Sequence, residues 1–290
     1  MKKLILLTMI LVASSLNAMG SYHVLVGGKA GYQFSKFDSK QLDNFFDNFN
    51  EQENRKIHSE ENGSKLEAPT SYNGFYIEYS IYKYLDKKSL IMLSYDLSCY
   101  FDYQKDERSW DFYYENIPEF ECSRHYDSRT WSLGVDYSLG ISPIKNYIIS
   151  LGTGISYERF DLKTYLSIPR NLPSGITKSN VLDYENNFFT MDDPNSNEDP
   201  FTTHADSTSM QNGTFETNGG SIKVNLKNEY FINNNIAINL DLNYKFTYYG
   251  RLKNDDDEKL RESQDSQKNM KLYGFSYFVR FGLSYYFLME

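Results

Sequence analysis

Histidines and their neighbours are the first residues in this chain that could carry out acid–base chemistry. There are four of them: His23, His58, His125 and His204. A histidine activates a serine when the two side chains lie within hydrogen-bond reach and an acid orients the histidine. His125 precedes Ser128 by three positions and His58 abuts Ser59, so no His-any-Ser pair shares one strand face. The sequence predicts that the protein is not an enzyme, although a Ser-His-acid set assembled across strands stays open.

Carboxylates are clustered in the segment 191–200, which reads MDDPNSNEDP. The cluster consists of Asp192, Asp193, Glu198 and Asp199. Oxygen ligands at this density could hold Ca²⁺, but their spacing does not match the calcium loop with glycine at its sixth and glutamate at its twelfth position. We expect a solvated acidic loop here and at 255–258, with no metal and no cofactor.

The two cysteines, Cys99 and Cys122, leave two interpretations open. In an exported chain they can form a disulfide. Two unpaired thiols are an equal alternative, because Cys99 falls on a predicted strand and Cys122 in a predicted loop.

The candidate histidines, carboxylates and cysteines must be positioned by secondary structure, and the sequence predicts strands with one apolar and one polar face. The clearest is 235–250, NIAINLDLNYKFTYYG, in which apolar and polar residues alternate from Ile238 to Tyr248. Period two over this length predicts a strand longer than the usual five or six residues of a globular strand. Seven further segments carry the pattern, the first two more weakly: 22–34, 74–84, 91–102, 131–141, 147–158, 222–232 and 275–287. The chain is therefore predicted to be all-β with eight strands.

Short and long connections alternate strictly between these strands. The short ones are 85–89, 142–146 and 233–235, and the long ones are 35–73, 104–128, 162–218 and 251–271. An antiparallel up-and-down barrel with three tight periplasmic turns and four long extracellular loops produces this order. A lipocalin-like barrel or a sandwich would bury apolar residues rather than carry charges on nearly every polar face. We therefore expect a transmembrane barrel.

The composition agrees with an exported chain that meets lipid. Lys2 and Lys3, an apolar run from Leu4 to Ala13 and small residues up to Gly20 resemble a secretory signal peptide. We expect residues 1–20 to be this signal and residues 21–290 to be the barrel domain. Aromatic residues make up 17% of the chain although its mean hydropathy is −0.60, which is typical of a lipid-facing band with aromatic interfaces. The net charge of −9 argues against a nucleic-acid partner.

The polar strand faces place charged side chains inside the predicted barrel. These luminal charges are Lys29, Glu78, Asp96, Asp136, Glu158, Lys223, Lys227, Glu229, Asp241, Lys245 and Arg280. An eight-stranded barrel is only wide enough for side chains to fill. The near balance of basic and acidic residues favours a salt-bridged plug, since an unpaired charge in low dielectric is costly. A gated ion path through that plug is the alternative.

The last predicted strand carries the most specific motif. Arg280, Gly282, Tyr285 and Phe287 follow the order polar, any, glycine, two of any, aromatic, any, aromatic. Together with the strand pattern from Tyr22 to Phe287, this motif resembles that of the small bacterial outer-membrane β-barrels, a class that includes the OmpA transmembrane domain, OmpX and the opacity proteins. The resemblance implies an outer-membrane location, contact with lipid and lipopolysaccharide, and recognition of the motif by the barrel-assembly machinery. The chain departs from the class by adding residues 288–290 after the last aromatic.

The long connections combine acidic charge with aromatic residues. The four segments contain 17 Lys and Arg against 29 Asp and Glu, a net charge of −12, which repels lipopolysaccharide phosphates at the tips and favours basic partners. The binding candidates are Trp110, Phe112, Tyr113, Tyr114, Phe188 and Phe189. Exposed apolar clusters rimmed by polar residues mark interaction surfaces. An equal alternative is that the strands extend beyond the membrane and these aromatic side chains pack against the extended strands.

The function predicted from these features is that of a non-enzymatic, monomeric surface barrel. Its loops would bind a host or neighbouring protein, or it would stabilise the outer membrane. A small channel for ions or hydrophobic compounds is the first alternative, and a lipid-modifying enzyme is the second.

Overall fold

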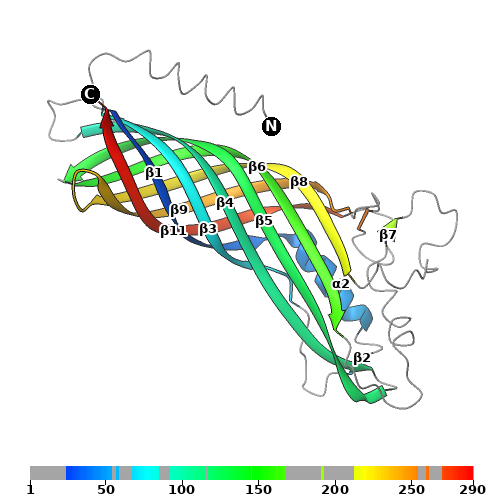
Figure 1. The fold of residues 1–290 in the computed structure, drawn as a ribbon. Coiled ribbons are helices and arrows are strands. Elements are labelled where there is room, and N and C mark those ends of the chain that lie inside the picture. The colour runs from blue at the N-terminus through cyan, green and yellow to red at the C-terminus, as the bar shows by residue number, and fades with distance from the viewer. Residues whose placement is uncertain are drawn as a thin grey trace.

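The fold is one antiparallel sheet that closes on itself as a tilted barrel (Figure 1). The computed structural model describes residues 24–53, 57–58, 67–84, 92–114, 117–144, 146–167, 191–192, 212–253, 259–260 and 270–289. The eight long strands are β1 (Val24–Asp38), β3 (Ser71–Tyr84), β4 (Met92–Tyr114), β5 (Ile117–Ile144), β6 (Tyr147–Ser167), β8 (Asn212–Phe231), β9 (Ile236–Arg251) and β11 (Lys271–Met289). The smaller elements are helix α2 (Lys40–Glu53) and the two-residue strands β2 (Ile57–His58), β7 (Met191–Asp192) and β10 (Lys259–Leu260). The predicted signal peptide lies outside the described residues.

Closure follows from strand β1, which pairs with β3 on one side and with β11 on the other. Each long strand pairs with its neighbours along the chain, as an up-and-down barrel requires. Followed once round from Gly28, the register returns to β1 at Asp38, ten residues further on. Such a stagger tilts the strands against the barrel axis, typically by about 35–45°. The predicted eight-stranded architecture is confirmed.

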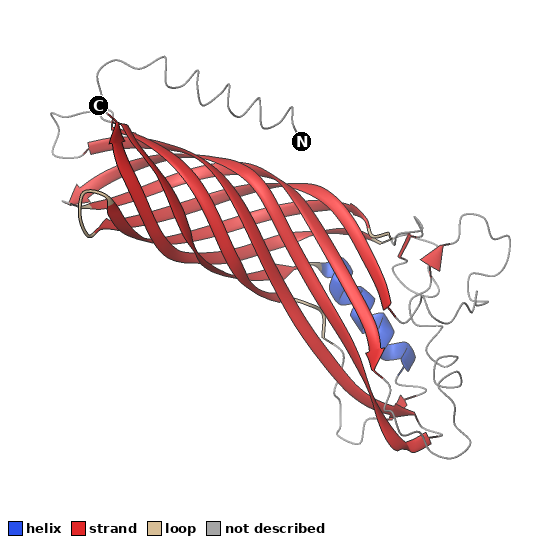
Figure 2. Ribbon diagram, viewed as in Figure 1, coloured by secondary structure: helices blue, strands red, loops and turns tan. Residues whose placement is uncertain are grey.

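The strands are longer than predicted at the end with the long connections. The segment 104–128 is not a loop, because β4 and β5 stay paired from Met92↔Ser142 up to Tyr114↔Ile117. The third connection is also shorter than predicted, since β6 continues to Ser167 and β8 begins at Asn212. The first connection contains helix α2, in which Ser39 Oγ accepts a hydrogen bond from the Leu42 amide as an N-cap (Figure 2).

The short turns lie at the opposite end. Strands β5 and β6 join between Ile144 and Tyr147, where Asn146 adopts φ 66°, a conformation that asparagine tolerates. Strands β8 and β9 join through the hydrogen bond from the Ile232 amide to the Ile236 carbonyl. The predicted turn 85–89 lies outside the described residues.

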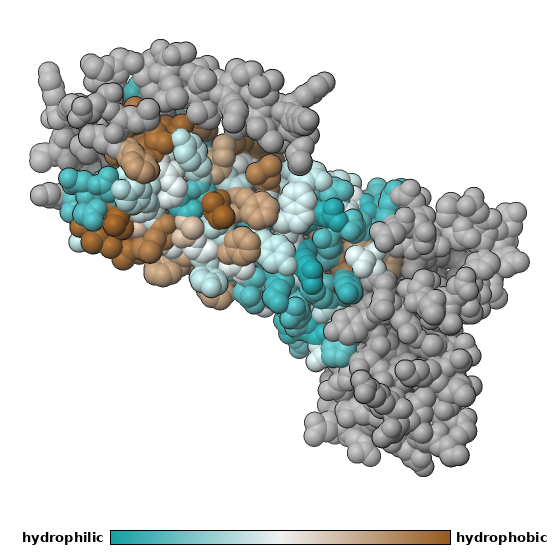
Figure 3. Space-filling view, viewed as in Figure 1, coloured by the Kyte–Doolittle hydropathy of each residue, from teal (hydrophilic) through white to brown (hydrophobic). Residues whose placement is uncertain are grey.

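The outward face changes from apolar to charged at a similar level on several strands. Towards the short turns it carries exposed aliphatic and aromatic side chains such as Leu139, Leu151 and Phe281. The last large residues before the change form an aromatic girdle that includes Tyr103, Trp131 and Tyr157. The ring centroid of Trp131 lies 5.4 Å from that of Tyr157 and 6.5 Å from that of Phe101, which precedes Tyr103 on the same face of β4. Beyond the girdle the outward positions are charged, as at Lys105, Arg129 and Arg159. Figure 3 shows the same change, with brown atoms on the barrel half near the C-terminus and teal atoms towards the loop end.

The apolar band has the height of a bilayer core. On β5 it runs over the eleven residues from Trp131 to Ile141, or about 33 Å along the strand and about 25 Å after the tilt. Transmembrane barrels carry an apolar band of about this height between aromatic girdles. We therefore divide the molecule into a membrane barrel and an extramembrane barrel, the latter formed by the strand residues beyond the girdle. Among the described residues, no helix is long and apolar enough to cross a membrane.

The strand register decides between the two interpretations of the cysteines. Cys122 lies in strand β5 and not in a loop. Cys99 faces Val135 on β5, and Val135 is thirteen residues from Cys122, or about 43 Å along the strand. Bonded cysteines have Cα atoms less than about 7 Å apart, so these two do not form an intramolecular disulfide.

Candidate functional site

The interior of the membrane barrel holds all eleven side chains that the sequence places there. Each is at most 6% exposed. They come from all eight long strands, because inward positions recur at every second residue of a strand. Asp102 of β4 joins them at 2% exposure and is missing from the predicted set. Asp102 could have been predicted from the sequence, because it lies on the polar face of its strand.

Arg280 is the centre of this charged layer. Its Nη2 lies 2.6 Å from Asp102 Oδ2, and its Nη1 lies 3.4 Å from Glu78 Oε2. Its Nε donates a hydrogen bond of 3.0 Å to Gln33 Oε1. The guanidinium carbon also lies 4.8 Å from the ring centroid of Tyr100. Arg280 therefore joins β11 to β1, β3 and β4 across the lumen.

Lys227 and Lys29 extend the network from Glu78 towards the short turns. Lys227 Nζ lies 3.0 Å from Glu78 Oε1 and 2.6 Å from Asp96 Oδ2. Lys29 Nζ lies 3.3 Å from Glu78 Oε1 and also contacts Glu229. These contacts connect opposite walls, so Glu78 is shared by three cations.

Two further pairs complete the layer towards the loop end. Lys245 Nζ lies 3.0 Å from Glu158 Oε2. Lys223 Nζ lies 2.8 Å from Asp136 Oδ2 and 3.5 Å from the ring centroid of Tyr100. Cations that are buried against aromatic faces gain a favourable interaction with the ring.

Asp241 is the exception among the eleven luminal charges, because it alone is in no ion pair within the described part of the chain. Both of its carboxylate oxygens are buried, and neither has a hydrogen-bond partner within the described part of the chain. Lys227 and Arg280 face it directly in the strand ladder, but their charged ends reach to other acids. The layer thus contains one carboxylate between two cations that are engaged elsewhere.

Apolar layers close the charged layer at both ends. At the short-turn end, a buried cluster fills the barrel and comprises Leu25, Tyr82, Ile148, Phe231, Ala237 and Tyr286. Tyr286 donates a 2.8 Å hydrogen bond to Glu229 Oε1, which connects this cluster to the charged layer. In the extramembrane barrel the inward positions of most strands become apolar, whereas β4 keeps the buried polar residues Gln104 and Asp106. The fully buried apolar residues there include Phe160 and Phe215, with Leu252 directly after β9.

Helix α2 adds to the apolar layer at the loop end (Figures 1 and 2). Its buried residues are Leu42, Phe45 and Phe46, which lie one helical turn or one residue apart and share a face. The ring of Phe46 lies 5.3 Å from that of Tyr126 on β5. These phenylalanines lie in a segment that was predicted to be a loop. Their helical spacing could have predicted the helix, which covers the mouth of the barrel.

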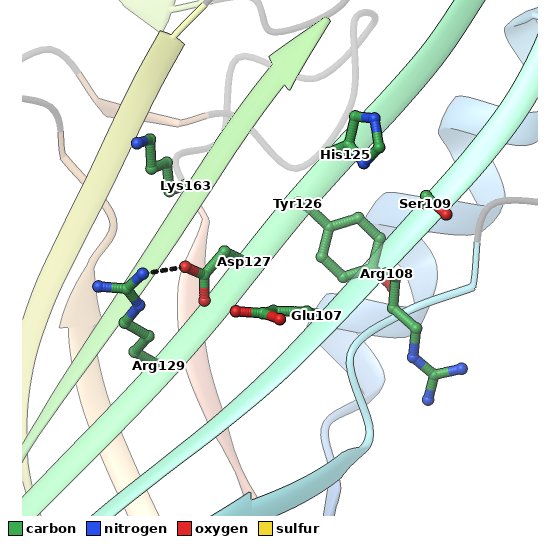
Figure 4. Close-up of a pocket in the computed structure, with 8 residues that line it drawn as sticks. All are labelled: Glu107, Arg108, Ser109, His125, Tyr126, Asp127, Arg129 and Lys163. Atoms are coloured by element: carbon green, nitrogen blue, oxygen red, sulfur yellow. Dashed lines mark hydrogen bonds and ion pairs between the residues drawn. The ribbon is translucent and has the colours of Figure 1, made fainter. Parts of the chain in front are cut away.

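A cleft of about 440 Å³ lies on the extramembrane barrel, on strands β4, β5 and β6 (Figure 4). Its lining comprises Glu107, Arg108, Ser109, His125, Tyr126, Asp127, Arg129 and Lys163. Burial raises the pKa of the Tyr126 hydroxyl, and its hydrogen bond goes to the Glu67 carbonyl. The hydrogen bond with Asp127 raises the pKa of Arg129. The lining is mixed in charge and lies just beyond the girdle.

The cleft brings together serine, histidine and acid residues that are distant in sequence. Ser109 faces His125 across the β4–β5 ladder, and Asp127 is two residues from His125 on the same strand face. Asp127 is paired with Arg129, and Glu107 is paired with Lys105. Each of the two acids is thus engaged by a cation. Among the other histidines, His58 is in β2, while His23 and His204 lie outside the described residues.

The predicted binding and metal candidates fall mainly where side chains are not described. Trp110, Phe112, Tyr113 and Tyr114 are backbone members of strand β4 near its tip. Phe188 and Phe189 lie outside the described residues, as do Asp193, Glu198 and Asp199, while Asp192 is in β7. Within the described chain, no group of three or more His, Cys, Asp or Glu side chains is arranged to hold a metal ion.

The predicted assembly motif divides between the two faces of β11. Tyr285 and Phe287 face outward, are 47% and 59% exposed, and have ring centroids 4.8 Å apart. Arg280 and Gly282 face inward. A Cβ at Gly282 would lie 2.7 Å from the Tyr76 hydroxyl and 2.3 Å from the Ala30 carbonyl oxygen. The fold itself therefore requires two of the four motif residues.

The sequence matches no protein-family model and no curated protein. The chain is similar to several solved structures. Ail, the attachment invasion locus protein of Yersinia pestis, is 10% identical, with 91% of this chain and 99% of that chain covered and a TM-score of 0.39. The outer membrane protease OmpT from Escherichia coli is 9% identical, with 93% and 99% covered and a TM-score of 0.39. A major outer membrane protein from Thermus thermophilus is 10% identical, with 92% and 100% covered and a TM-score of 0.41. The architecture described above rests on the strand pairing of this chain.

Proposed function

We propose that the protein is an outer-membrane barrel that is closed to flow and that acts at the cell surface, through its extramembrane barrel and loops, by binding a protein partner. The observation that carries the proposal is the layered interior. A charged layer centred on Arg280 lies between an apolar layer around Tyr286 and another around Phe160. An eight-stranded barrel filled in this way leaves no room for bulk flow.

The partner chemistry follows from the charge of the long connections. The segments that were predicted as loops carry a net charge of −12. An acidic surface of this kind attracts basic partners and speeds their encounter. The projecting β4–β5 hairpin presents this charge farthest along the strands, since its ladder extends to Tyr114↔Ile117.

Shortening the hairpin tests this proposal. Deleting the whole region Thr164–Thr217 is unsuitable, because the deletion would remove the buried Phe215 and the paired ends of β6 and β8. We would instead replace residues 111–123 with a two-residue Asn-Gly turn, which suits a hairpin and joins Trp110 to its ladder partner Arg124. Cells that display the full chain should adhere to a surface coated with a basic protein, in a salt-dependent manner. Cells with the shortened hairpin should adhere several-fold less, and equal adhesion would contradict the proposal.

A further inference from the structure

Three adjacent strands repeat one arrangement of charges just beyond the girdle. On β4, Lys105 Nζ lies 2.8 Å from Glu107 Oε1. On β5, Arg129 pairs with Asp127, as the dashed line in Figure 4 shows. On β6, Arg159 Nε lies 2.8 Å from Asp161 Oδ1. In each pair the cation is two residues nearer to the membrane barrel than its acid.

The three cations form a row, which we call the basic row, directly above the aromatic girdle. Lys105 faces Arg129 in the β4–β5 ladder, and Arg159 faces Trp131 in the β5–β6 ladder. The next outward residues on the membrane side are the girdle residues Tyr103, Trp131 and Tyr157. Other strands continue the pattern, with Lys36 beyond Phe34 on β1 and Lys271 beyond Tyr273 on β11.

The basic row keeps donors available although each cation is paired. The side chains of Lys105, Arg129 and Arg159 are 44%, 48% and 31% exposed. A guanidinium has five N–H donors, and a lysine ammonium has three. Lys105 and Arg129 each meet one carboxylate on the tip side, and Arg159 meets two there, Asp161 and Glu216 of β8. These pairs use only part of the donors of each cation, which leaves donors for a ligand on the membrane side.

We propose that the basic row binds the phosphate groups of anionic lipids in the leaflet on the loop side of the membrane. This binding depends on the proposed function, which places the barrel in a membrane. Lipid phosphates lie immediately outside the hydrocarbon core, which is the height of residues that follow an interfacial aromatic girdle. Each Lys or Arg near an anionic membrane surface adds to the attraction.

The order of charges favours a lipid over a soluble polyanion. A soluble polyanion that approaches from the tip side meets Glu107, Asp127 and Asp161 before it meets the basic row. Those carboxylates repel it. A lipid phosphate reaches the cations from the membrane side without passing the acids.

The girdle supplies its own reporter for the test. The chain has two tryptophans, Trp110 and Trp131, and Trp131 is two residues from Arg129. In the full chain carrying Trp110→Phe, the fluorescence of Trp131 is quenched by lipids with brominated acyl chains that lie beside it. The protein is inserted into vesicles of phosphatidylcholine mixed with phosphatidic acid, with one or the other lipid brominated. Quenching should show a several-fold preference for phosphatidic acid.

Neutralising the basic row should remove this preference. The triple variant Lys105→Gln, Arg129→Gln, Arg159→Gln should show no preference, and Arg129→Gln alone should reduce it by about half. The matched control is Lys163→Gln, an exposed cation on the same face of β6 but nearer to the tip, which should keep the preference. Salt at about 1 M, where the Debye length is about 3 Å, should weaken it.

Four outcomes would overturn the proposal. The first is equal quenching by both lipids in the parent, and the second is a preference that persists in Arg129→Gln and in the triple variant. The third is displacement of phosphatidic acid by added hexametaphosphate from the parent but not from the triple variant. That result would make the basic row a site for soluble polyanions. The fourth is no quenching by either lipid, which would refute the membrane placement itself and, with it, this site.

Discussion

Replacing Arg280 with methionine should lower the free energy of unfolding by about 3–5 kcal/mol, because the change leaves Asp102 buried without its cation. Glu78 would keep Lys227 and Lys29, but it would lose its contact with Arg280 on β11. Urea unfolding of the protein in vesicles, followed by the gel mobility of unheated samples, measures the loss.

The same substitution at Arg129 provides the control. Arg129 is also paired with an aspartate, but its side chain is 48% exposed. An exposed ion pair contributes about 0–1 kcal/mol, so Arg129→Met should change stability little. Adding Asp102→Asn to Arg280→Met should recover part of the loss, since the two residues are in contact. Equal losses in Arg280→Met and Arg129→Met would mean that the charged layer does not hold the barrel together.

Replacing Phe160 with alanine should destabilise the extramembrane barrel by about 3–5 kcal/mol, because the ring is fully buried and its loss leaves a cavity. The ring centroid of Phe160 lies 5.7 Å from that of Tyr249, so the change also removes an aromatic contact between β6 and β9. Limited proteolysis of the inserted protein should cut β6 and β8 beyond the girdle faster, while the membrane barrel keeps its unheated gel mobility.

Lys163→Ala is the control for this change, because Lys163 is three residues away on β6 and is exposed. It should leave the proteolysis rate unchanged. If Phe160→Ala behaved like this control, the apolar layer at the loop end would not stabilise the extramembrane barrel.

The membrane barrel was predictable from sequence because its physical requirement is simple. Lipid outside and charges inside produce an alternation with period two, as in Leu240, Asp241 and Leu242. The same alternation identified the luminal charges, and Asp102 was omitted although it shares the inward face of β4 with Asp96.

The extramembrane barrel was not predictable from the same rule because its polarity is inverted. Beyond the girdle the inward residues of most strands are apolar, as at Phe160 and Leu162, and outward residues are charged, as at Arg159 and Asp161. A pattern search that expects an apolar outward face reads these strands as loops. The partners within the charged layer were also hidden, since Arg280 and Asp102 meet across the lumen and are 178 residues apart.

Current through single molecules in a planar bilayer tests most directly whether the barrel is closed. Protein whose insertion is shown by its unheated gel mobility should pass no steady current, because buried apolar layers lie on both sides of the charged layer. Asp241→Asn should be equally silent, although this residue is the luminal carboxylate between two engaged cations. Steady openings in most insertions of the unaltered chain would contradict the account and would make the loops and helix α2 the gates of a channel.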